Sequence, residues 1–166
     1  MLKPAAFFDR DGVINEEKNY VYKSLDFEWI EGSQESIKFL NENNYHVFVI
    51  SNQSGIARGL YTKKDVAKLH KYINAELKKI GAYIDEFFIS PYHPLYPKKF
   101  KNLAHLRKPN IGMLEQADSK WSIDKGNSFL IGDKEIDIEC AKNYGIRGHL
   151  FSSGNLLDFI KRSENI

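Results

Sequence analysis

The sequence has only one cysteine, Cys140, among its 166 residues, and its positive and negative charges nearly cancel. One cysteine excludes an intramolecular disulfide framework and a four-cysteine metal site, and it is typical of a reducing compartment. A net charge of +2, from 24 Lys and Arg against 22 Asp and Glu, is too small to drive binding to a nucleic acid or a membrane. No apolar run approaches the ~20 residues of a membrane span, and the apolar stretch near the N-terminus is too short for a signal peptide. We therefore expect a cytoplasmic protein with no membrane or nucleic-acid partner.

What the sequence does contain is the composition of one folded domain. Apolar residues make up 42% and aromatic residues 13% of the chain, far too many aromatics for a disordered protein. No stretch rich in Gly, Ser or Pro is typical of an interdomain linker, and no repeat is visible. A length of 166 residues predicts a single domain over residues 1–166, and a monomer is the default expectation at this size.

Short apolar runs alternate with amphipathic segments along the chain. The apolar runs predict strands at residues 5–8, 47–50, 87–89, 129–131 and 149–151. The amphipathic segments predict helices at 33–43, 62–80, 110–121 and 135–144, followed by a short C-terminal helix. Ser33 and Thr62 are the expected N-caps of the first two helices, and Ile80 is expected to end the buried stripe of the second. This alternation predicts an α/β fold with a doubly wound, mostly parallel sheet and no large cap domain.

Polar side chains follow the predicted strands at the point where each apolar run ends. In a doubly wound sheet the ligand binds at the carboxyl ends of the strands. The residues there are Asp9, Ser51, Ser90 and Asp133. Residues 90–108, with three prolines near their start, predict a long loop beside them, and loops of this length are often functional.

Two acidic motifs fit metal and phosphate chemistry. Asp9 and Asp11, in Asp-Arg-Asp-Gly, would supply a carboxylate nucleophile and a second carboxyl group for proton transfer, with Mg²⁺ beside them. The alternative interpretation is an acidic turn. Asp133 fits a Mg²⁺ ligand with Asp137 supporting the site from one helical turn further on, or else a cap for the helix that follows.

Two other motifs fit phosphate recognition. Residues 51–55, Ser-Asn-Gln-Ser-Gly, offer hydroxyl and amide donors to phosphate oxygens, although alone they are more typical of a polar turn. Lys108 would neutralise developing negative charge and Arg107 would bind a second anionic group. The alternative for this pair is a solvated basic pair before a helix.

Taken together, the segments FFDRDGVIN, SNQSGIARG, RKP and GDKEID resemble the haloacid dehalogenase superfamily of phosphatases. More narrowly, they resemble the D-glycero-D-manno-heptose 1,7-bisphosphate 7-phosphatases, which are similar to the phosphatase halves of histidinol-phosphate phosphatases. The resemblance covers residues 5–155. The Asp-x-Asp element is found across the superfamily, whereas the other segments are specific to this branch.

The resemblance implies a role for each residue that matches the motifs. Asp9 would be the nucleophile and a Mg²⁺ ligand, and Asp11 the general acid and base, which also gives its backbone carbonyl to the metal. Asp133 would complete the Mg²⁺ ligands. Lys108 would stabilise the phosphoryl group, and Arg107 would recognise the other end of the substrate.

The resemblance also implies a set of substrate contacts. These are Glu17, Lys18, Asn19, Tyr20, Ser51, Asn52, Gln53, Ser54, Arg107, Lys108 and Lys134. Asn15 and residues 17–20 would form a mobile flap over the substrate.

One departure from the family concerns zinc. Many members hold a structural zinc with three Cys and one His in the loop before Arg-Lys-Pro. The corresponding positions in this sequence are Ser90, Tyr92, Ala104 and Leu106. These side chains are not usual zinc ligands, so we predict Mg²⁺ as the metal and no zinc.

The expected function is therefore that of a Mg²⁺-dependent phosphomonoesterase. It would remove the 7-phosphate of the heptose bisphosphate through an aspartyl phosphate, in nucleotide-activated heptose biosynthesis for lipopolysaccharide or capsule. Its partner would be a small sugar phosphate of unassigned anomer. Histidinol phosphate or another small sugar phosphate is an alternative substrate. A nucleic-acid end-processing enzyme or a non-catalytic binding module is the alternative of another class. The former is supported only by a basic cluster, Lys98, Lys99, Lys101, Arg107 and Lys108.

Overall fold

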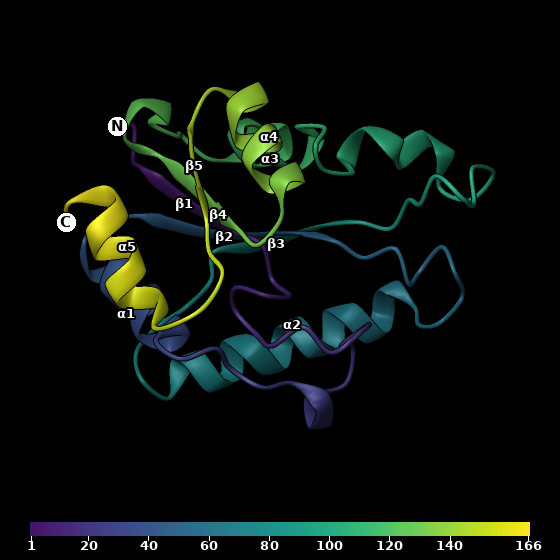
Figure 1. The fold of residues 1–166 in the computed structure, drawn as a ribbon, viewed down its shortest axis with the longest axis horizontal. Helices are drawn as coiled ribbons and strands as arrows, with labels where there is room; N and C mark the ends of the chain where they lie inside the picture. Colours follow the sequence, from purple (N-terminus) through teal and green to yellow (C-terminus); the bar gives the residue numbers. More distant parts are fainter.

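Five parallel strands form one sheet in the computed structural model, which describes residues 1–166 (Figure 1). The strands are β1 (Ala5–Phe8), β2 (His46–Asn52), β3 (Glu86–Ser90), β4 (Phe129–Gly132) and β5 (Arg147–Leu150). Their order across the sheet is β3-β2-β1-β4-β5. The order reverses between β1 and β4, so the ligand crevice is expected at the carboxyl ends of these two strands. The predicted doubly wound α/β fold is confirmed.

Helices cover both faces of the sheet (Figure 1). They are α1 (Ser33–Glu42), α2 (Lys63–Lys78), α3 (Gly112–Lys120), α4 (Glu135–Tyr144) and α5 (Leu156–Glu164), with short 3₁₀ helices at Ser24–Asp26, Lys101–Leu106 and Lys125–Asn127. None of these helices has the length and apolar character that crossing a membrane requires.

Two separate cores result from the two-residue period of the strands. Val47 and Val49 of β2 pack toward α1, α2 and α5, whereas Phe48 and Ile50 pack toward α3 and α4. All of these side chains are fully buried. Because the central strands are apolar on both faces, the first polar residue after each of them marks the edge of the sheet and therefore the site.

The ends of two helices differ from the prediction. The expected Ser33 cap is wrong: Gly32, in the left-handed conformation with φ of 77°, is the N-cap of α1, and the buried Ser33 hydroxyl has no hydrogen-bond partner. Thr62 caps α2 as expected, in a reciprocal capping box with Asp65. That helix ends at Lys78, however, and Ile80 is 38% exposed because Gly81 reverses the chain there with φ of 76°.

This contrast gives a matched test of helix capping. Thr62→Ala is expected to lower the free energy of unfolding by about 1 kcal/mol, because the hydrogen bonds of the Thr62 hydroxyl at the start of α2 are lost. Ser33→Ala, in contrast, removes a hydroxyl that bonds nothing and is expected to change stability by less than about 0.5 kcal/mol. Urea unfolding of both variants checks the difference. Equal losses would show that the capping box contributes nothing of its own.

Candidate active site

Three carboxylates converge where β1 and β4 end. Asp9 directly follows β1, Asp133 follows β4, and Asp137 lies in the first turn of α4. One oxygen from each lies within 4.8 Å of the others. Asp133 Oδ1 is buried and accepts no hydrogen bond. A buried carboxylate oxygen without a donor, close to two further carboxylates, is the arrangement that a hard divalent cation satisfies.

The turn after Asp11 brings the backbone against Asp133. Gly12 has φ of +88°, and a Cβ added there would lie 2.2 Å from Asp133 Oδ2. Only glycine fits both the left-handed backbone and this close approach. Gly12 therefore allows the β1 turn and the Asp133 carboxylate to approach one another closely.

Gly12→Ala is accordingly expected to weaken Mg²⁺ binding by at least about 10-fold, because the new methyl group displaces Asp133. Gly81→Ala is the control: its φ of +76° imposes similar backbone strain, but no atom lies within 4 Å of the added Cβ. The apparent Mg²⁺ affinity is measured by isothermal titration calorimetry. Equal affinity in the two variants would mean that Asp133 does not bind the metal.

Lys108 carries the only cation that contacts the carboxylate cluster. Its Nζ lies 3.0 Å from Asp9 Oδ1 and 2.6 Å from Asp137 Oδ1, and its side chain is 2% exposed. Burial lowers the pKa of Lys108, but the two carboxylates outweigh burial and the net pKa is raised. The Asn52 side chain fixes the Lys108 backbone through two hydrogen bonds, of 3.0 Å from the Lys108 amide and 3.3 Å to its carbonyl. Lys108 is therefore held in its charged form beside Asp9.

The surroundings of Asp9 carry excess negative charge. The pKa of Asp9 is raised to about 8: burial is the largest cause, Asp137, Asp11 and Asp133 also raise it, and Lys108 lowers it. A divalent cation among these oxygens would offset both the desolvation and the repulsion. The donor set, carboxylates without thiolate or imidazole, suits a hard divalent cation such as Mg²⁺.

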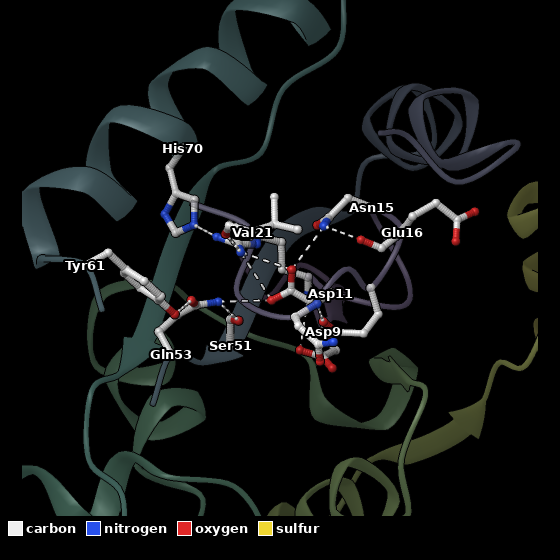
Figure 2. A network of polar contacts seen from close by, with 12 residues as sticks. Asp9, Asp11, Asn15, Glu16, Val21, Ser51, Gln53, Tyr61 and His70 are labelled. Carbon is white, nitrogen blue, oxygen red and sulfur yellow. Dashed lines mark hydrogen bonds and ion pairs between the residues drawn. The ribbon is translucent and has the colours of Figure 1, made fainter. Parts of the chain in front are cut away.

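The Asp11 carboxylate is held by nitrogen donors on both of its oxygens (Figure 2). Asn15 Nδ2 donates to Oδ1 at 3.0 Å, and Gln53 Nε2 donates to Oδ2 at 3.2 Å. Arg10 Nη2 donates to both oxygens, at 3.0 and 3.2 Å. Asn15 is fully buried, so its expected place in a mobile flap is wrong. The turn folds back on itself through a 2.7 Å bond from the Gly12 amide to the Asn15 carbonyl, which puts Asn15 against Asp11.

Two adjoining cavities open above these groups. The smaller, of about 190 Å³, is lined by Asp9 and Asp11, and the larger, of about 300 Å³, extends toward residues 17–20. Of the predicted substrate contacts, those that line one or both cavities are Glu17, Asn19, Tyr20, Asn52, Gln53, Ser54, Arg107, Lys108 and Lys134.

Two predicted substrate contacts do not reach either cavity. Lys18 points to Glu28, with 2.6 Å between Nζ and Oε2, and both side chains are exposed. Ser51 is 1% exposed, and its hydroxyl accepts a 2.7 Å hydrogen bond from Gln53 Nε2. Ser51 therefore contacts Gln53 behind the cavity wall.

The loop before Lys108 places Arg107 at the smaller cavity. Arg107 Nη1 donates to the Tyr92 carbonyl at 3.3 Å, and no carboxylate forms an ion pair with it. Lys99 Nζ, in the same loop, donates a hydrogen bond to the Ala57 carbonyl at 3.1 Å. Leu106, one of the four positions at which the family resemblance implied a zinc ligand, is 4% exposed and packs in the core with Phe88. Hydrogen bonds and apolar packing thus hold this segment against the fold.

Three residues of the site escaped the sequence analysis: Arg10, Tyr61 and His70. Arg10 is fully buried, and His70 Nε2 lies 3.3 Å from its Nη1. The Tyr61 hydroxyl donates to Gln53 Oε1 at 2.6 Å (Figure 2). For Arg10 the sequence did hold a signal, because it stands between Asp9 and Asp11, and a buried charged residue needs a partner of opposite charge. No local pattern marks Tyr61 or His70.

Comparisons with known proteins identify the family of this chain. A family model described as polynucleotide kinase 3 phosphatase matches residues 4–147. The chain is 39% identical over 161 residues to the D-glycero-beta-D-manno-heptose-1,7-bisphosphate 7-phosphatase of Rhodopseudomonas palustris, a match that spans 96% of this chain and 89% of the relative. It is 41% identical over 143 residues to the D-glycero-alpha-D-manno-heptose-1,7-bisphosphate 7-phosphatase of Photorhabdus laumondii, a match that spans 85% of this chain and 78% of the relative.

A solved structure matches as well. The D,D-heptose 1,7-bisphosphate phosphatase of B. bronchiseptica, crystallised with magnesium and phosphate, aligns with a TM-score of 0.80 at 27% identity, over 96% of this chain and 86% of that chain. Fold and site together define a phosphatase with the haloacid dehalogenase-like fold. Within that class, the chain belongs to the heptose-1,7-bisphosphate 7-phosphatase family, as the sequence motifs indicated.

Proposed function

We propose that this protein removes the 7-phosphate of D-glycero-D-manno-heptose 1,7-bisphosphate, in the synthesis of nucleotide-activated heptose. One observation carries the chemistry: Lys108 Nζ lies 3.0 Å from Asp9 Oδ1 at the end of β1, with Asp11 two residues further on. A buried carboxylate beside a fixed cation and a second carboxylate supports phosphoryl transfer to a side chain. The choice of sugar follows from the relatives, which are named for this substrate.

In the first step, an Asp9 oxygen attacks phosphorus, and the bond from phosphorus to the sugar oxygen breaks. Asp11 gives a proton to the departing oxygen, which leaves as the sugar hydroxyl. Lys108 faces the attacking oxygen and reduces its repulsion by the phosphoryl oxygens. The product of this step is an aspartyl phosphate on Asp9.

In the second step, water attacks the phosphorus of the aspartyl phosphate. Asp11, now ionised, takes a proton from that water, and the bond from phosphorus to Asp9 breaks. Inorganic phosphate leaves and both carboxylates return to their initial state. Asp9, Asp133 and the Asp11 backbone carbonyl would hold Mg²⁺, which supplies positive charge to the phosphoryl oxygens when it is bound.

The lining of the smaller cavity supports a substrate with two anionic ends. This cavity holds the reacting groups together with Arg107, whose guanidinium has no carboxylate partner. A second phosphate on the substrate would supply that partner. Histidinol phosphate has no second phosphate and would leave Arg107 unpaired.

We further propose a single domain, a monomeric state, a cytoplasmic location and a loop over residues 90–108 that needs no zinc. Residues 1–166 act as one domain because both cores pack on one sheet. The protein is a cytoplasmic monomer, and the loop over residues 90–108 is held without zinc by the Lys99 and Asn52 contacts. Sedimentation analysis and elemental analysis of the purified protein test the monomer and the absence of zinc.

The activity is tested by phosphate release with Mg²⁺ from both anomers of the heptose 1,7-bisphosphate. Histidinol phosphate and a 3′-phosphorylated oligonucleotide run in the same assay, the latter because the family model is named for a 3′-phosphatase. We expect one phosphate per sugar from at least one anomer, and little from the other two substrates. Preferential release from the oligonucleotide or from histidinol phosphate would overturn the proposed substrate and leave the two chemical steps in place.

A further inference from the structure

A fully buried arginine lies between the two catalytic carboxylates of the first motif. The Arg10 side chain is 0% exposed. Its Nη2 donates to both Asp11 oxygens and to the Val21 carbonyl, the last at 2.5 Å. Two N–H groups on one nitrogen are thus shared among three acceptor oxygens. A shift of the Val21 carbonyl therefore changes how strongly Arg10 holds Asp11.

His70 completes the surroundings of Arg10. Its Nε2 lies 3.3 Å from Arg10 Nη1, and its ring stacks on Phe87 with 4.1 Å between the centroids. Burial, followed by the Arg10 charge, lowers the pKa of His70 to about 3. Because guanidinium can only donate, the neutral imidazole accepts at Nε2. His70 thereby anchors Arg10 through a different nitrogen from the one that holds Asp11.

Tyr61 acts on Asp11 through a second set of contacts. Its hydroxyl donates to Gln53 Oε1 at 2.6 Å, which fixes the orientation of the Gln53 amide. The amide nitrogen then faces Asp11 Oδ2 and the Ser51 hydroxyl (Figure 2). Burial raises the pKa of Tyr61 to about 12, so the hydroxyl keeps its proton. The absence of a side chain at Gly55 makes room, since a Cβ there would lie 2.2 Å from the Tyr61 ring.

Both sets of contacts lead to the segment that follows the flap. Arg10 bonds the carbonyl of Val21, and the ring of Tyr22 stacks on Tyr61 with 4.9 Å between the centroids and 16° between the planes. Val21 and Tyr22 directly follow Tyr20, which lines the larger cavity. Two separate routes thus connect the flap to the two oxygens of Asp11.

We propose that Arg10 and Tyr61 are positioning residues that fix the Asp11 carboxylate and link its orientation to the flap. Arg10 is fully buried, and although Tyr61 lines the larger cavity, its hydroxyl is bonded to Gln53. Asp11 must deliver a proton to the sugar oxygen and later remove one from water, so small errors in its orientation slow both transfers. The proposal rests on the proposed phosphatase function and adds to it the residues that orient its acid and base.

Tyr61→Phe is the sharpest test, because phenylalanine keeps the ring beside Gly55 and the stack on Tyr22 and loses only the hydroxyl. Single-turnover phosphoenzyme formation is measured with the heptose bisphosphate, with glycerol phosphate as a simple alkyl phosphate, and with 4-nitrophenyl phosphate. The nitrophenolate leaves without a proton, whereas the alkyl oxygens need one from Asp11. We expect the rate constant of phosphoenzyme formation to fall about 10-fold for the alkyl phosphates, with KM nearly unchanged. The nitrophenol burst should change little.

Tyr144→Phe is the matched control. Tyr144 and Tyr61 are both 6% exposed, but Tyr144 packs on Phe7 in the core beside α3 and α4, whereas Tyr61 packs with Ile56 and Val66. A fall that is equal for alkyl and nitrophenyl substrates in Tyr61→Phe, or no fall beyond that of Tyr144→Phe, would overturn the role of Tyr61.

Arg10→Lys keeps the charge but loses the guanidinium N–H groups shared between Asp11 and the Val21 carbonyl. We expect the rate constant of phosphoenzyme formation from the alkyl phosphates to fall about 100-fold. Faster amide exchange in residues 17–22 of this variant is the expected sign of the link to the flap. Unchanged exchange there would overturn the link. If wild-type protein hydrolyses glycerol phosphate but not the heptose bisphosphate, the proposed substrate is wrong, and the comparison of alkyl with nitrophenyl phosphate still decides the roles of Arg10 and Tyr61.

Discussion

Asp9→Asn is expected to lower kcat by a factor on the order of 10⁴ or more, the largest effect of any single substitution in this chain. An amide oxygen is a poor nucleophile and forms no stable phosphoryl ester, so the first chemical step is lost. The substitution also removes one of the three clustered carboxylates and with it a full ligand charge. The rate is measured with saturating Mg²⁺, so that weaker metal binding alone does not account for the loss.

The folded state of this variant should be nearly unaffected. Asparagine has the shape of aspartate, and the ion pair between Lys108 and Asp137 at 2.6 Å is retained. Removing the charge also removes the burial cost, and the smaller repulsion by neighbouring carboxylates, that raise the pKa of Asp9. We expect a thermal unfolding midpoint within a few degrees of the wild-type value in metal-free buffer. Wild-type turnover by the variant with Mg²⁺ would exclude Asp9 as the nucleophile.

Lys108→Met is expected to affect both activity and stability. The substitution leaves the Asp9 and Asp137 carboxylates without their cation, and breaking a buried ion pair from one side costs about 3 to 5 kcal/mol. Loss of the charge beside the phosphoryl oxygens is expected to lower kcat by about 10²- to 10³-fold. Urea unfolding without metal and steady-state kinetics with Mg²⁺ measure the two effects separately.

A second substitution separates these two effects. The double variant Lys108→Met with Asp137→Asn also removes the negative charge of Asp137 on α4, which has no cation beside it once Lys108 is replaced. The side-chain oxygen of the introduced amide can still accept the hydrogen bond that Asp137 Oδ2 receives from the Lys134 amide at 3.1 Å. We expect the double variant to regain about half of the lost stability and none of the lost activity. Recovered activity would show that Lys108 matters only because it balances Asp137.

The parts of this site that the sequence predicts are those placed by the strands themselves. Asp9 and Asp133 follow fully apolar strands, so the end of each apolar run gives their position at the sheet edge without any tertiary knowledge. Thr62 was predictable for a similar reason, because its cap involves only residues 62–65.

The parts that escaped prediction depend on how the chain turns and packs around them. Ser33 resembles a cap locally, yet the chain enters α1 through a left-handed glycine. Asn15 resembles part of a loop, yet the turn buries it against Asp11. Tyr61 acts on Asp11 only because the segment between β2 and α2 returns to Gln53. No local sequence pattern predicts that a segment folds back in this way, because the contact depends on tertiary packing and not on the periodicity of a helix or strand.

The strand order also determines when the protein can become active during its synthesis. β1 lies between β2 and β4, so its second neighbour is made about 120 residues after β1 itself. On the ribosome, β1, β2 and β3 can pair early, but the Ala5–Phe8 edge stays open until β4 emerges. An open apolar strand edge invites pairing with other chains. A nascent chain interrupted after β3 is therefore both inactive, because it lacks Lys108 and Asp133, and exposed to aggregation. Residues 108–137 supply the missing site residues and cover β1, but the apolar edge of β4 stays open until β5 pairs with it.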